Sequence, residues 1–172
     1  MTPDLVKLRA KQKSLRVVLD NLELTLVDEA QWTKPSDTSY LNDASRANPD
    51  VMANVAAMAA TNTLVAWFGE DSEGFVGLWR GVACRPLASS PVVKLDTEGQ
   101  YEIVAMTVPD YIAISVSKDD FDETRKALVK AGLKVGRDRD AIWAKLNEWS
   151  DDPNEFRNSL YDHIKKKKRS QP

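Results

Sequence analysis

The residues that could support nucleophilic catalysis are few and far apart in this 172-residue chain. It contains one cysteine, Cys84, and one histidine, His163, and neither lies in a pattern typical of a nucleophile with its base. Cys84 belongs to a polar Arg-Pro segment, whereas His163 precedes the basic C-terminal run. We interpret them as a free thiol and a helix-surface histidine, with a Cys–His pair as the alternative.

The sequence gives equally little support for a metal site or a phosphate-binding site. One Cys and one His cannot form a zinc site of the usual kind, and no Asp-rich loop matches the EF-hand pattern. The segment 69–74 has glycine at both ends but lacks the Lys-Ser/Thr pair of a phosphate-binding loop. We therefore expect no metal and no cofactor.

Carboxylates are the remaining candidates for acid–base chemistry, and they gather in two short polar segments. The first holds Glu70, Asp71 and Glu73, and the second holds Asp96 and Glu98. Paired carboxylates held a few ångströms apart hydrolyse glycosides, so a hydrolase using Asp71 and Glu98 is one hypothesis. Acidic residues are also common in tight turns, which offers a purely structural explanation.

Short runs of β-type residues flank both acidic segments. Residues 63–68 and 75–79 surround the first segment, and residues 92–95 and 101–106 surround the second. Runs of about five apolar residues bounded by Gly, Asp and Ser are typical of strands joined in hairpins. We predict a small, mostly antiparallel sheet of about four strands within residues 63–106.

Helical patterns occupy the chain on either side of this sheet. Apolar residues at helical spacing predict one amphipathic helix over residues 3–29, and Asn48-Pro49-Asp50 predicts the start of an alanine-rich helix. Later helices are expected to begin near residues 109, 117, 138–140 and 153. The third of these should place Ile142, Leu146 and Trp149 on one face, and residues 165–169 should form a frayed basic tail.

The predicted architecture is a single α+β domain spanning residues 1–172. It consists of a helical N-terminal part (1–62), a sheet core (63–116), C-terminal helices (117–164) and a basic tail (165–172).

Charge and composition narrow the function classes. The formal net charge of -2 favours neither nucleic acid nor membrane as a partner. A single cysteine and the lack of a signal-peptide pattern favour a cytoplasmic protein. Charge is segregated along the chain, because residues 20–73 contain ten acids and two bases. An acidic surface suits a basic partner, since opposite potentials speed encounter and fix orientation.

The aromatic residues of the predicted strands could also bind a partner. Trp and Arg are enriched at binding hot spots, so Trp79 beside Arg80 could anchor an interface. The alternative is that Trp79 belongs to the sheet core, because side chains alternate between the two faces of a strand.

The centre of the chain resembles the SUKH superfamily. The resemblance rests on the runs WFGEDSEGFVGLW (residues 67–79) and PVVKLDTEG (residues 91–99), followed by a strand and short helix at residues 104–114. It covers residues 63–116, whereas residues 30–62 lack the family's Leu-Pro-x-x-Tyr segment. The positions that match are Trp67, Gly74, Gly77, Pro91, Val92, Val93, Leu95, Glu98 and Gly99.

The resemblance implies a non-enzymatic role. Bacterial members of the family are often immunity proteins that bind and neutralise a cognate antibacterial toxin, frequently a nuclease, and eukaryotic members are regulatory binding modules. It points to Glu98 and the acids of residues 70–73 as partner-facing. The resulting hypothesis is a toxin-neutralising protein, with a regulatory scaffold or adaptor and a carboxylate-dependent hydrolase as alternatives; the oligomeric state stays open.

Overall fold

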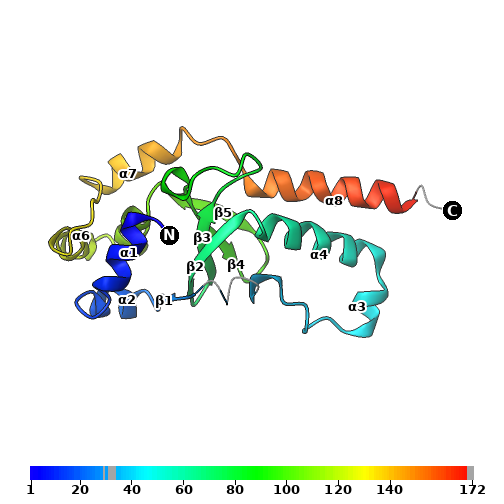
Figure 1. Cartoon of the computed structure of the whole chain (residues 1–172), viewed down its shortest axis with the longest axis horizontal. Helices are drawn as coiled ribbons and strands as arrows, with labels where there is room; N and C mark the ends of the chain where they lie inside the picture. Colours follow the sequence, from blue (N-terminus) through cyan, green and yellow to red (C-terminus); the bar gives the residue numbers. More distant parts are fainter. Residues whose placement is uncertain (29, 31–33, 170–172) are drawn as a thin grey trace.

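The computed structural model describes residues 1–28, 30 and 34–169, and these residues form the predicted α+β fold (Figure 1). One antiparallel sheet has the strand order β1-β2-β3-β4-β5. The strands are β1 (Thr25–Leu26), β2 (Val65–Asp71), β3 (Gly74–Trp79), β4 (Val92–Asp96) and β5 (Tyr101–Ala105). The α-helices are α1 (Pro3–Ala10), α2 (Arg16–Asn21), α3 (Asp43–Ala47), α4 (Pro49–Asn62), α5 (Val108–Ser115), α6 (Phe121–Lys130), α7 (Arg139–Leu146) and α8 (Pro153–Arg169), with short 3-10 helices η2 (Lys34–Ser36) and η3 (Leu87–Ser89).

The two predicted hairpins are confirmed, with a fifth strand added to them. β2 pairs with β3 and β4 pairs with β5, and the β3–β4 register places Gly74 opposite Asp96. Both hairpin turns therefore lie at the same end of the sheet. The fifth strand, β1, pairs Thr25 with Glu70 inside a region expected to be helical.

The predicted single helix over residues 3–29 is wrong. α1 ends after Ala10, where basic side chains near its C-terminus interact favourably with the helix dipole. α2 ends in a Schellman motif: the Leu24 N–H donates to the Leu19 carbonyl and the Glu23 N–H to the Asp20 carbonyl. Glu23 takes the left-handed conformation, with φ of 51°, and this directs the chain into β1. Residue 29 lies outside the described residues.

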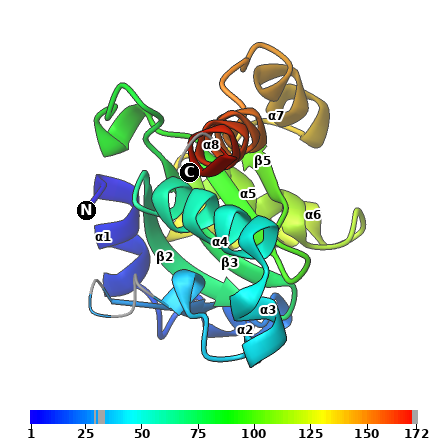
Figure 2. The same ribbon diagram turned by 90° about the vertical axis from the view of Figure 1, so that its right-hand side faces the viewer.

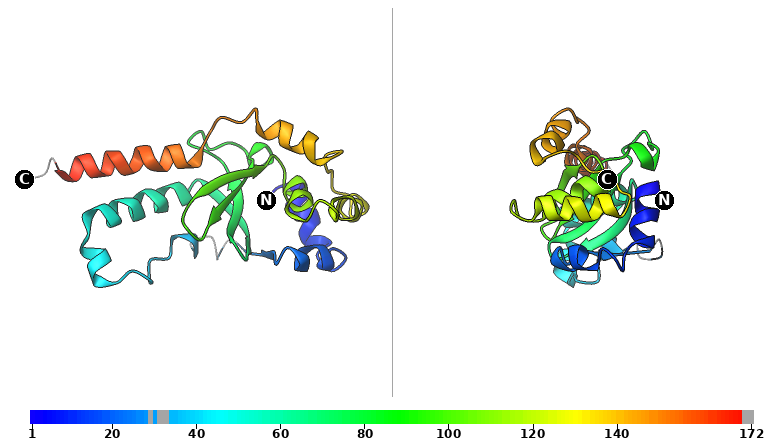
Figure 3. Two further views of the ribbon diagram at one scale, coloured as in Figure 1. Left: turned by 180° about the vertical axis from the view of Figure 1, so that it is seen from behind. Right: turned by 90° about the vertical axis from the view of Figure 1, so that its left-hand side faces the viewer.

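Helices cover both faces of the sheet. One core joins α1, α2, α5 and α6 to side chains such as Phe68, Val76 and Leu78. The other joins Trp67 and Trp79 to Met58 of α4 and Phe156 of α8. In Figure 2 α4 and α8 lie in front of the sheet, and Figure 3 shows them extending beyond it, away from α6 and α7.

Most predicted helix starts are confirmed by capping contacts. The side chains of Asn48, Thr107 and Asp138 accept hydrogen bonds from backbone N–H groups of α4, α5 and α7. Ser117 and Asp120 form the predicted pair, with 2.7 Å between their side-chain oxygens, but the helix expected to begin at Ser117 begins only at Phe121.

Two C-terminal predictions need correction. α7 ends at Leu146, so Trp149 does not share its apolar face and instead packs in the core beneath α4 and α8. The basic run 165–169 continues α8, and Lys165 forms an ion pair with Asp50 at the start of α4. Opposite charges at these two helix ends suit both dipoles. Within the described chain, no helix combines the length and apolar character required to cross a bilayer.

Candidate functional site

The β2–β3 turn is built around the Asp71 carboxylate. Its Oδ1 atom accepts hydrogen bonds from the backbone N–H groups of Glu73 (2.9 Å) and Gly74 (3.0 Å). Gly74 has φ of 148°, and a Cβ atom there would lie 2.0 Å from the Leu95 carbonyl oxygen. Glycine is therefore required for the close approach of β3 to β4.

The second oxygen of Asp71 connects this turn to β4 and α5. The Tyr111 hydroxyl donates to Oδ2 over 2.9 Å, and the Lys94 ammonium lies 2.9 Å from the same oxygen. The Asp71 side chain is only 7% exposed and that of Lys94 15%. Lys94 also pairs with the exposed carboxylate of Glu73. One ammonium thus positions two acids of the turn.

The pKa shifts in this network follow from burial and pairing. Burial disfavours the charged form of Lys94, but its contacts with Glu73 and Asp71 outweigh burial and raise the pKa of the ammonium. Burial, reinforced by the negative charge of Asp71, also raises the pKa of the Tyr111 hydroxyl. Lys94 is consequently a permanent cation and Tyr111 a permanent donor at neutral pH.

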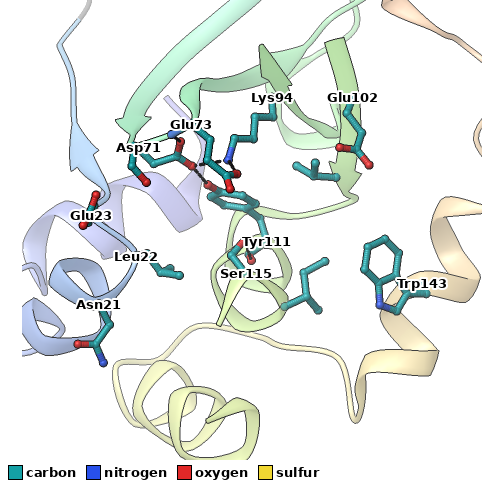
Figure 4. Close-up of a pocket in the computed structure, with 13 residues that line it drawn as sticks. Asn21, Leu22, Glu23, Asp71, Glu73, Lys94, Glu102, Tyr111, Ser115 and Trp143 are labelled. Atoms are coloured by element: carbon teal, nitrogen blue, oxygen red, sulfur yellow. Dashed lines mark hydrogen bonds and ion pairs between the residues drawn. The ribbon is translucent and has the colours of Figure 1, made fainter. Parts of the chain in front are cut away.

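A hollow of about 410 Å³ opens beside this network. Figure 4 shows the Asp71–Lys94–Tyr111 contacts on one side, with Glu23 at the end of α2 and Trp143 of α7 on opposite flanks. The residues that line it are Asn21, Leu22, Glu23, Asp71, Ser72, Glu73, Lys94, Glu102, Val104, Tyr111, Ile114, Ser115 and Trp143. The four carboxylates and one ammonium in this set make the hollow acidic.

A second hollow, of about 630 Å³, continues the first toward the β4–β5 turn. The two share Ser72, Glu73, Lys94 and Glu102. Asp96 shapes this turn by accepting hydrogen bonds from the backbone N–H groups of Glu98 (2.9 Å) and Gln100 (2.8 Å). Arg157 of α8 fixes the turn from outside by donating to the Gly99 carbonyl.

The structure gathers four of the seven predicted binding residues at this end of the sheet. Asp71 and Glu73 line the first hollow, and Glu73, Asp96 and Glu98 line the second. Glu70 lies apart, because alternation along β2 turns it to the α4 side, where it pairs with Lys34. Arg80 lies at the opposite end of β3 and donates hydrogen bonds to the carbonyls of Arg85 and Cys84.

The prediction that Trp79 anchors a partner is wrong for this structure. Its side chain is 0% exposed and packs against Phe156 of α8, with ring centroids 6.3 Å apart. A tryptophan without exposed surface belongs to the core, and this was the alternative interpretation of the sequence.

Cys84 and His163 are not brought together in a buried cleft. Cys84 is exposed in the turn after β3, and His163 is exposed on α8. Among the residues that the structure describes, no group of three or more His, Cys, Asp or Glu is placed to hold a metal ion.

Of the residues that line the first hollow, the sequence predicted only Asp71 and Glu73 as binding residues, and it missed Lys94 and Tyr111 as well as Glu102, Glu23 and Trp143. Glu102 could have been found from the hairpin register, because it faces Lys94 directly across β4 and β5. Glu23 was hidden by the prediction of an unbroken first helix. Trp143 carries no local signal, since its place beside the hollow depends on how α7 packs against β5.

Comparison with known proteins identifies no relative of this chain. No family model, curated protein or solved structure matches the chain.

Proposed function

We propose that this chain is a binding protein that holds a basic protein partner, most specifically an immunity protein that neutralises a cognate antibacterial toxin. The observation that carries the proposal is the joining of two acidic hollows at one end of the sheet. Glu73 and Glu102 belong to both hollows, while Asp71 lines only the first and Glu98 only the second. A continuous acidic surface of this kind attracts a basic protein and orients it.

The rigidity of the surface supports recognition. Each hairpin turn is held by a carboxylate that caps its own backbone amides, and the Lys94 and Arg157 side chains tie the turns to β4 and α8. A preorganised surface loses little conformational entropy when a partner binds. The toxin-neutralising role itself comes from the resemblance of residues 63–116 to the SUKH superfamily.

The hydrolase hypothesis receives no such support. Asp71 and Glu98 line different hollows, and Asp71 already accepts bonds from Tyr111, Lys94 and the turn amides. A carboxylate occupied in this way is poorly placed to exchange protons with a substrate.

The test is co-expression with the product of the neighbouring gene, because immunity genes lie beside the genes of their toxins. We expect that product to be toxic alone, harmless beside this chain, and recovered with it in a pull-down. Failure of both protection and recovery would remove the toxin-neutralising proposal. A harmless neighbour that still binds would favour the regulatory scaffold.

A further inference from the structure

Trp143 gives the first hollow an exposed aromatic wall. Its side chain, on α7, is 43% exposed, although large aromatic side chains usually lie inside. Figure 4 shows the indole turned from α7 toward the hollow, on the far side from the Asp71–Lys94 pair. An exposed tryptophan beside carboxylates is a favourable surface for a cation, because the ring face carries negative potential.

Within the described part of the chain, two carboxylates of the hollow form no ion pair. Glu102 faces Lys94 in the strand register, yet the Lys94 ammonium is bound to Asp71 and Glu73 instead. Over residues 1–28, 30 and 34–169, no hydrogen bond or ion pair reaches the side chain of Glu102 or Glu23. With four acids and one base, the lining has a formal charge of minus three.

The rest of the lining is apolar enough to hold an aliphatic chain. Leu22, Val104 and Ile114 contribute to it, and Ile114 is only 7% exposed. An acidic rim, an aromatic wall and apolar surface together match a side chain that has a hydrocarbon stem and a cationic head. Arginine fits better than lysine, because its guanidinium stacks on aromatic faces, binds carboxylates through two hydrogen bonds, and is more weakly hydrated.

We propose that this hollow is a receptor for one arginine side chain on the surface of the protein partner. The guanidinium stacks on Trp143 and bonds to Glu102, while its stem lies along Val104 and Ile114. This inference rests on the proposed function and assigns the partner's contacting group. It also makes Trp143 and Glu102 binding residues, which the sequence did not indicate.

The experiment uses small probes and needs no partner. The indole N–H signal of Trp143, assigned by its loss in the Trp143→Phe variant, is followed by NMR during titration with N-acetyl-arginine methylamide. The same amide of citrulline, which has the shape of arginine without its charge, is the matched control. We expect a saturable shift with arginine and at least about threefold weaker binding for citrulline, since an exposed charge pair is worth up to about a factor of five.

A variant pair locates the contact. Glu102→Gln should weaken arginine binding about threefold, whereas Glu123→Gln, which alters an exposed acid of α6, should leave binding unchanged. Equal shifts with arginine and citrulline, tighter binding of the lysine analogue, or equal binding by both variants would overturn the inference. These outcomes are independent of co-expression, so failure of the arginine site and failure of the proposed function can be distinguished.

Discussion

The buried contact between Asp71 and Lys94 should be the strongest single determinant of the shape of the acidic surface. Asp71→Ala removes the acceptor for Tyr111 and for two turn amides and leaves the Lys94 ammonium with Glu73 alone. Removing one partner of a buried pair costs about 3–5 kcal/mol. Because Lys94 keeps Glu73, we expect a loss of about 3 kcal/mol in the free energy of unfolding.

A double-mutant cycle isolates the interaction itself. We expect Lys94→Met alone to cost about 1–2 kcal/mol, since Asp71 keeps Tyr111 and its turn amides. The coupling between the two substitutions should be about 1–2 kcal/mol. The assay is urea denaturation, followed by circular dichroism, of the wild type, both single variants and the double variant.

The matched control is the exposed pair of Arg16 and Asp20 on α2. Its side chains are 80% and 65% exposed and stand four residues apart, so its coupling should be only about 0.3–0.5 kcal/mol. If the Asp71–Lys94 coupling were no larger than that of the control, burial would not strengthen the network, and the reasoning that Lys94 positions the acidic turn would be refuted.

Three further predictions concern backbone strain, packing and pH. Glu23→Gly should raise the free energy of unfolding by about 0.5–1 kcal/mol in urea denaturation, because glycine adopts φ of 51° without strain; a loss of stability would contradict this. Gly77→Ala should lower the free energy of unfolding by about 1–3 kcal/mol in the same assay, since the new Cβ atom would lie 2.3 Å from Val65. An unchanged denaturation midpoint would show that β2 moves aside at no cost in stability. Above about pH 10 stability should fall, because burial raises the pKa values of Tyr101 and Tyr111, so that these tyrosines ionise only when unfolded. Below the pKa of the unfolded tyrosines this stabilisation is fully present; above it, the free energy of unfolding falls by about 1.4 kcal/mol per pH unit for each tyrosine. Tyr111→Phe should roughly halve the contribution of the two tyrosines to the slope of this free energy against pH, measured by denaturation at a series of pH values.

The sequence predicted the hairpins and most helix starts because these depend on local chemistry. Glycine and acid clusters at residues 69–74 and 96–100 mark the two hairpins, although β2 extends to Asp71 and β3 begins at Gly74, so the first turn is shorter than predicted; Asn48-Pro49 defines the start of α4. It did not predict the break between α1 and α2, because the Leu residues of both helices contribute to one core and therefore continue a single apolar period. Glu23 in a left-handed position also lacks the glycine that usually marks a helix end.

Some residues of the candidate site could likewise be predicted from the sequence, and others could not. The acids of the two turns were found because turn residues are recognisable along the chain. Trp79 was misplaced because alternation along a strand does not tell which face is buried, and here helices cover both. Trp143 reaches the hollow because α7 packs against a segment about forty residues earlier in the chain. No local sequence pattern predicts such a contact.

The central claim is that the acidic end of the sheet recognises a basic protein. The most direct measurement is the calorimetric affinity of the neighbouring gene's product for wild type, for Glu73→Lys/Glu102→Lys, and for Glu123→Lys/Asp162→Lys, in which two exposed acids outside the hollows are reversed. We predict at least a roughly tenfold loss for the first double variant and little change for the second, with the difference shrinking at high salt. Equal affinity for all three proteins would contradict the claim.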